Sequence, residues 1–142
     1  MNSLEIVVER PPVWEMVRAK FKIQDDKTVF TYGDKLYNPA DVPIDEFLYA
    51  HEQTHQKQHA AYEGGPAAWW ARYLEDREFR VEQEMEAYRV QYKAFAKQCK
   101  DRERCFRFRM QLANDLASPM YGAGIFPVYA AALILQKQSP TE

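Results

Sequence analysis

The sequence has few cysteines, little net charge and no long apolar run. Its 142 residues include two cysteines, Cys99 and Cys105, and the 19 basic and 21 acidic residues leave a net charge of -2. Two cysteines are too few for the disulfide framework of a small secreted domain, so we expect both thiols to be reduced. A nearly neutral chain lacks the basic surface that binds nucleic acid or an anionic membrane, so we expect no nucleic acid and no membrane as partners.

Signals for export or membrane insertion are also missing. The first residues contain no basic segment ahead of an apolar one, so we expect a cytoplasmic location. One stretch without charge, residues 120–135, is shorter than the ~20 residues that a spanning helix needs, and glycine and proline interrupt it. This stretch predicts a buried turn and helix.

The composition that remains is typical of a globular protein. Hydrophobic residues make up 46% of the chain, charged residues 28% and aromatic residues 14%. Aromatic side chains bury large areas, and we expect Trp69 and Trp70 to belong to the core. No internal repeat or low-complexity segment divides the sequence, which predicts a single domain over residues 1–142.

The order of the predicted elements indicates an α+β fold. Residues 4–9 are typical of a short strand, Pro11-Pro12 begins a helix, and Gly33-Asp34 lies at the turn of a hairpin formed by residues 28–32 and 35–37. Three helices are then predicted, up to about residue 62, over 67–76 and over 79–95. The charged region 97–109 predicts a solvated helix face. We therefore expect a small N-terminal β-sheet packed on a mostly helical remainder.

Two signals bound the first of these three helices. We expect Asp41 or a neighbouring residue to be its N-cap, with Asp45 and Glu46 in the first turn. Gly64-Gly65-Pro66 breaks the helical pattern at its other end.

This helix carries the motif His51-Glu52-Gln53-Thr54-His55. Residues four apart lie on the same face of a helix, so His51 and His55 can bind one metal ion. Glu52 is rotated by about 100° from His51, which places its carboxylate beside the metal. A carboxylate in that place can act as general base toward a water whose pKa zinc lowers to about 7. The motif therefore predicts a Zn²⁺ site with Glu52 as the catalytic residue.

A catalytic zinc site needs a third protein ligand. His59 follows His55 by four residues, but three ligands in a row on one straight helix would splay apart, and we expect His59 to be a surface residue or a supporting group. Glutamates of the following segments are the other candidates. Glu84 lies at the edge of a predicted core stripe formed by Val81, Met85, Tyr88, Tyr92 and Phe95. Glu84 is the first candidate, and Glu78, Glu86 and Glu75 stay open.

The two segments together resemble the gluzincins, zinc metallopeptidases in which one helix carries His-Glu-x-x-His and a second helix carries a glutamate ligand. Compact members have Glu-x-x-Ala on that second helix, often followed by Asp or Asn. Glu84-Met85-Glu86-Ala87-Tyr88 is similar to this signature, with Glu84 at the ligand position. Tyr88 stands where the family has the Asp or Asn that orients a ligand histidine. The last two thirds of the chain also resemble small phage-borne metallopeptidases.

The resemblance implies a zincin-like α+β fold and hydrolysis of a peptide or protein substrate, in the host cytoplasm if the chain is phage-encoded. It also implies that the predicted hairpin lies beside the substrate, and it makes Tyr121, Tyr88 and His59 candidates for stabilising the transition state. An alternative is a catalytically inactive zincin-like module of a phage that binds zinc or a partner. The oligomeric state stays open.

Overall fold

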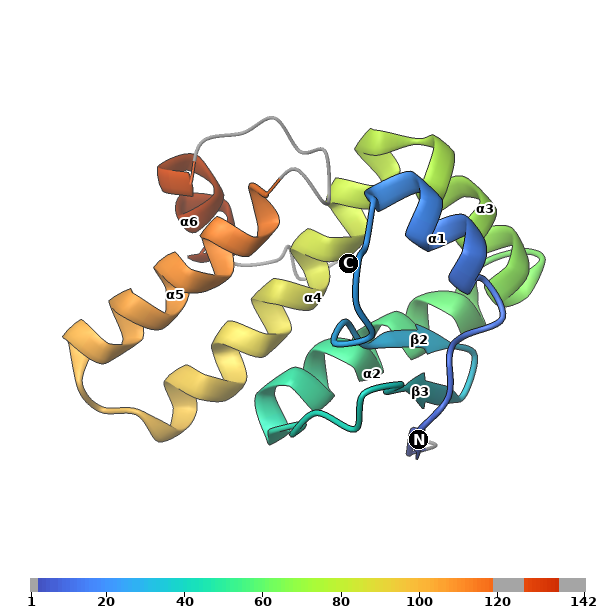
Figure 1. The fold of residues 1–142 in the computed structure, drawn as a ribbon. Coiled ribbons are helices and arrows are strands. Elements are labelled where there is room, and N and C mark those ends of the chain that lie inside the picture. Colours follow the sequence, from blue (N-terminus) through green and yellow to red (C-terminus); the bar gives the residue numbers. More distant parts are fainter. Residues whose placement is uncertain (1–2, 119–126, 136–142) are drawn as a thin grey trace.

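A computed structural model describes residues 3–118 and 127–135, with the side chains of residues 127–129 left out (Figure 1). The described residues form, in chain order, β1 (Glu5–Val7), α1 (Trp14–Phe21), β2 (Phe30–Tyr32), β3 (Lys35–Tyr37), α2 (Glu46–Ala61), α3 (Gly65–Glu75), α4 (Arg77–Gln98), α5 (Arg102–Leu116) and α6 (Pro127–Leu135). Residues 120–126, which are the part of the uncharged stretch ahead of α6 and include Tyr121, lie outside the described residues. The predicted α+β class with a small sheet and a mostly helical remainder is confirmed.

The three strands form one sheet in the order β1-β3-β2. β2 and β3 pair antiparallel as the predicted hairpin, and Gly33 takes a φ of 63° at its turn, a conformation that glycine adopts without strain. β1 pairs parallel to β3, with Ile6 beside Leu36. Within the part of the chain that the structure describes, β2 is therefore an edge strand, and it packs against α2.

The ends of α2 follow from local chemistry. The Asp45 carboxylate accepts hydrogen bonds from the backbone N–H groups of Phe47 and Leu48, so Asp45 is the N-cap and α2 begins at Glu46. The predicted cap at Asp41 is wrong, because Asp41 has a φ of 52° in the preceding turn and lies too far from the first free N–H groups. The helix ends at Ala61, ahead of Gly64, whose φ is 95°.

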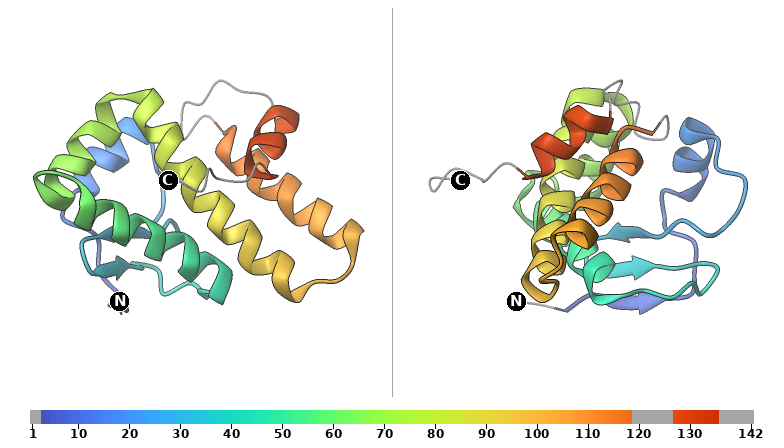
Figure 2. Two further views of the ribbon diagram at one scale, coloured as in Figure 1. Left: turned by 180° about the vertical axis from the view of Figure 1, so that it is seen from behind. Right: turned by 90° about the vertical axis from the view of Figure 1, so that its left-hand side faces the viewer.

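Helix α2 lies against both the sheet and α4. The right-hand view of Figure 2 shows the strands on one side of α2, α4 and α5, and α2 contacts β2 as well as α4. Helices α4, α5 and α6 pack together, with α4 and α5 side by side and antiparallel (Figures 1 and 2). A residue on the inner face of α2 can therefore meet one on the facing side of α4.

Two groups of buried side chains hold these layers. One joins α4, α5 and α6 and contains Met85, Tyr88 and Tyr92 of the predicted stripe, with Val81 packed at its margin. The other joins α1, β2, α3 and the start of α4 and contains Trp69 and Trp70, as predicted. Within the described ranges, no helix has the length and apolar character needed to cross a membrane.

Candidate metal centre

The two histidines of the motif lie on the buried face of α2. His51 is 4% exposed, Glu52 5% and His55 6%. One metal-ligating atom from each of these three residues lies within 4.8 Å of the others, a spacing that can hold a metal ion. The predicted cluster on α2 therefore forms in the folded protein.

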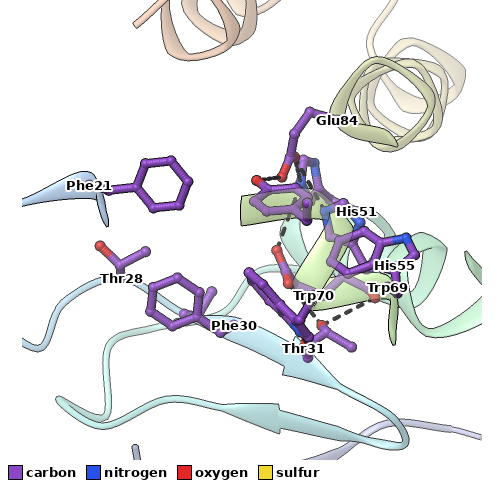
Figure 3. A pocket seen from close by; sticks show the side chains of 12 residues that line it. Phe21, Thr28, Phe30, Thr31, His51, His55, Trp69, Trp70 and Glu84 are labelled. Carbon is purple, nitrogen blue, oxygen red and sulfur yellow. Dashed lines mark hydrogen bonds and ion pairs between the residues drawn. The ribbon is translucent and has the colours of Figure 1, made fainter. Parts of the chain in front are cut away.

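Helix α4 brings Glu84 to the same point. Its Oε1 lies 3.1 Å from Nε2 of His51 and 3.2 Å from Nε2 of His55. Two ligand atoms bonded to one zinc at about 2.0–2.1 Å in tetrahedral geometry lie about 3.3 Å apart. The spacing of the three atoms thus fits one zinc ion with little movement of the side chains. Figure 3 shows Glu84 reaching from α4 toward the two imidazoles.

The other candidate glutamates lie elsewhere. Glu75 and Glu78 are exposed. Glu86 is half-buried, and its Oε1 accepts a hydrogen bond from Nε2 of Gln58 at 2.7 Å. Of the predicted glutamates, Glu84 is the one that the structure places against both histidines.

Each imidazole is oriented by a glutamine that the sequence analysis did not identify. Nδ1 of His51 lies 2.9 Å from Oε1 of Gln91, and Nδ1 of His55 lies 2.8 Å from Oε1 of Gln58. A glutamine Oε1 only accepts, so each Nδ1 carries the proton and each Nε2 is directed at Glu84. Gln91 lies one turn beyond Tyr88 on α4 and orients His51 from that helix.

The carboxylates are also held by partners from other elements. The Tyr73 hydroxyl on α3 donates to Oε2 of Glu84 at 2.5 Å, which leaves Oε1 for the histidines. The Thr31 hydroxyl on β2 donates to Oε1 of Glu52 at 2.8 Å, while Oε2 of Glu52 lies 3.8 Å from Nε2 of His51. The Glu52 carboxylate therefore lies beside the two imidazoles but farther from His51 than the Glu84 carboxylate does.

The electrostatics of the cluster favour a cation. Burial acts to lower the pKa of His55, but the Glu84 carboxylate raises it to about 9, with a further contribution from Glu52. Burial acts to raise the pKa of Glu84, yet the two histidines hold it far below its ordinary value. A divalent cation bound at Nε2 of both histidines would replace a proton as the positive charge beside the Glu84 carboxylate.

Of the two places predicted for His59, the surface is wrong, and the supporting position remains. It is 1% exposed, its Nδ1 accepts the Gly33 backbone N–H at 3.1 Å, and its ring packs on Trp69 at 4.3 Å between centroids. Burial, followed by the charge of His55, lowers the pKa of His59 to about 3, so the ring is neutral. The surface alternative failed because His51, His55 and His59, at four-residue spacing, share the buried face of α2. His59 connects α2 to the hairpin turn and thereby supports the helix that carries His51 and His55.

A cavity of about 40 Å³ opens onto the cluster. Figure 3 shows Phe21, Phe30 and Trp70 around it, opposite His51 and Glu84. Trp70, which belongs to the core, also lines the cavity. Its indole N–H donates to the Thr31 backbone oxygen at 3.0 Å. The space suits a metal ion and a few water molecules.

Compared with models of protein families, with curated proteins and with solved structures, the chain matches none.

Proposed function

We propose that the protein is a zincin-like zinc metallopeptidase in which His51, His55 and Glu84 bind zinc. The observation that carries this proposal is the 3.1 Å and 3.2 Å spacing between the Glu84 oxygen and the two imidazole nitrogens. Two nitrogens and one carboxylate oxygen match the three-ligand set of catalytic zinc sites, which keep a fourth position open. The glutamines behind both imidazoles are the supporting contacts that ligand histidines usually have.

Glu52 is the proposed general base. When bound, zinc supplies Lewis-acid activation of a carbonyl group and lowers the pKa of a water molecule toward about 7. The hydrogen bond from Thr31 fixes one oxygen of Glu52, and the other oxygen faces the cavity beside His51. That oxygen accepts the proton of the attacking water and can pass it to the leaving amine.

The edge strand β2 supports a peptide as the substrate. Phe30 and Thr31 line the cavity, and among the described strands β2 pairs with β3 alone, so its other side is an edge. An extended peptide can add to such an edge through backbone hydrogen bonds. This arrangement would carry a peptide carbonyl past Glu52, whose Oε1 accepts the hydrogen bond from the Thr31 hydroxyl.

The test compares the wild type with Glu52→Gln after both are loaded with zinc and incubated with a peptide library read by mass spectrometry. We expect cleavage by the wild type, loss of cleavage in Glu52→Gln by a factor of ~10² or more, and equal zinc content in both proteins. Equal cleavage by the two proteins would show that Glu52 is not the base.

A second candidate is a catalytically inactive zinc-binding module. The observation in its favour is the burial of the cluster, because Glu84 is 4% exposed and the cavity is small. In this alternative the metal stabilises the contact between α2 and α4. It predicts zinc that raises the unfolding temperature and a library that stays intact with wild type and Glu52→Gln alike.

A further inference from the structure

A second hollow, of about 160 Å³, reaches the metal centre from another direction. Thr28 and Val29 line both spaces, and so do His51 and Glu52. The remaining walls come from α2, α4 and α5, and they are Leu48, Tyr88, Gln91, Leu112 and Asp115. A ligand in this hollow therefore lies directly beside the proposed catalytic group.

Asp115 carries the charge of this hollow. It is exposed, so it lies at the rim, and its carboxylate has no hydrogen-bond or ion-pair partner among residues 3–118 and 127–135. Partial burial raises the pKa of the Asp115 carboxyl, while the charge of His51 acts in the opposite direction. A partly desolvated carboxylate without a counter-ion is stabilised by an incoming cation.

The other walls suit a long side chain with a charged end. Leu48 and Leu112 are apolar, and the Tyr88 ring, which packs on His51 with its centroid at 4.6 Å, offers an aromatic surface. Lysine and arginine bury their methylene groups against such surfaces and keep the charged end at a polar rim. An acidic side chain would meet Glu52 and Asp115, two carboxylates in the same lining.

We propose that this hollow receives a lysine or arginine side chain of the peptide substrate, with the Asp115 carboxylate as its counter-ion. The inference rests on the proposed peptidase function and adds a substrate class to it. The smaller cavity on the other side of the centre has Phe21, Phe30 and Trp70 in its lining, and no exposed carboxylate is among the described residues that line it. A basic residue is therefore preferred on one side of the scissile bond only.

Binding without turnover tests this inference. Zinc-loaded Glu52→Gln protein is immobilised and incubated with three pools of random peptides, whose one fixed residue is lysine, norleucine or glutamate. Bound peptides are quantified by mass spectrometry. We expect the lysine pool to be enriched about fivefold to tenfold over the norleucine pool, and the glutamate pool to be depleted.

Asp115→Asn in the same background should remove the lysine enrichment, and Asp115→Lys should transfer it to the glutamate pool. Glu103→Gln is the matched control, because it removes one acidic charge from an exposed position of the same helix, away from both hollows, and should keep the enrichment. Lysine enrichment that survives Asp115→Asn would overturn the assignment of Asp115.

A parallel library digest with wild-type protein separates the two proposals. Cleavage without lysine preference in either assay would overturn the inference and leave the peptidase proposal standing. Lysine-selective binding without any cleavage would support the assignment of the hollow as a binding site for a basic side chain and would contradict the proposed peptidase function. Neither binding nor cleavage in any pool would overturn both.

Discussion

The hydroxyl oxygen of Tyr73 lies 2.5 Å from Oε2 of Glu84, the carboxylate whose other oxygen contacts both imidazoles. This contact joins α3 to the pair of helices that carry the candidate ligands. Burial, together with the charge of Glu84, raises the pKa of Tyr73 well above its ordinary value, so the hydroxyl stays a donor across the accessible pH range. Tyr73 therefore positions Glu84.

Tyr73→Phe should weaken zinc binding about 10- to 100-fold, because Glu84 loses the donor that holds it toward the histidines. Competition with a chromogenic chelator measures the change. Tyr92→Phe is the control. The Tyr92 hydroxyl accepts a hydrogen bond from Arg109, and Tyr92 belongs to the buried group that joins α4, α5 and α6. Its substitution should leave zinc affinity unaltered. Equal affinity of wild type and Tyr73→Phe would refute the positioning role.

Gln58→Leu should lower zinc affinity by a similar factor of about 10- to 100-fold. The Gln58 amide donates to Glu86 and to the Gln83 backbone oxygen, which directs its own oxygen at His55. The matched control is Gln53→Leu, a half-buried position of α2 outside the metal centre. If both variants bound zinc as tightly as the wild type, Gln58 would have no part in orienting His55.

Zinc affinity should rise with pH up to about 9. In the metal-free protein the pKa of His55 is raised from 6.5 to about 9, so zinc must displace a proton below that pH. The apparent affinity should therefore increase about tenfold per pH unit between roughly 6.5 and 9 and then level off. Titrations in buffers of matched ionic strength check the slope, and an affinity independent of pH over this range would contradict the account.

The same shift sets the sign of a stability effect. A raised pKa in the folded state contributes stability below the unfolded pKa of 6.5, and this contribution is lost as the pH rises through about 9. The metal-free protein should thus lose stability over this range, whereas zinc-loaded protein should not. Denaturant unfolding with and without chelator measures both, and identical pH profiles would be the contrary result.

His59→Ala should destabilise the metal-free protein by about 1–3 kcal/mol, because the Gly33 N–H loses its buried acceptor and the Trp69 ring loses its neighbour. Zinc content should stay at the wild-type level, since His59 is tied to the hairpin turn. His59→Gln can restore an acceptor and should recover part of the stability. Loss of zinc in both variants, with folding intact, would return His59 to the set of ligands.

Local patterns explain what could be predicted from the sequence. The spacing of His51 and His55 and the glycines after Ala61 define the motif helix, because both depend on residues close in the chain. Glu84 could be ranked above its neighbours because it lies beside the core stripe of α4. Periodicity alone thus placed the motif helix and the first-choice glutamate.

The supporting contacts depend on how distant segments pack. Thr31 reaches Glu52 because β2 lies along α2, and Gln91 reaches His51 because α2 and α4 face each other. The parallel pairing of β1 with β3, which leaves β2 at an edge, also joins segments far apart in the chain. Helical spacing could still have shown His59 as buried, since it continues the face of His51 and His55.

Metal content tests the central claim most directly. Wild type, His55→Ala, Glu84→Ala, Glu52→Gln and the control Glu86→Gln are purified without chelator, reconstituted with zinc and measured by mass spectrometry of the metal. The account predicts about one zinc per chain in wild type, Glu52→Gln and Glu86→Gln, and its loss in His55→Ala and Glu84→Ala. Wild-type protein that holds no metal after reconstitution would contradict the account.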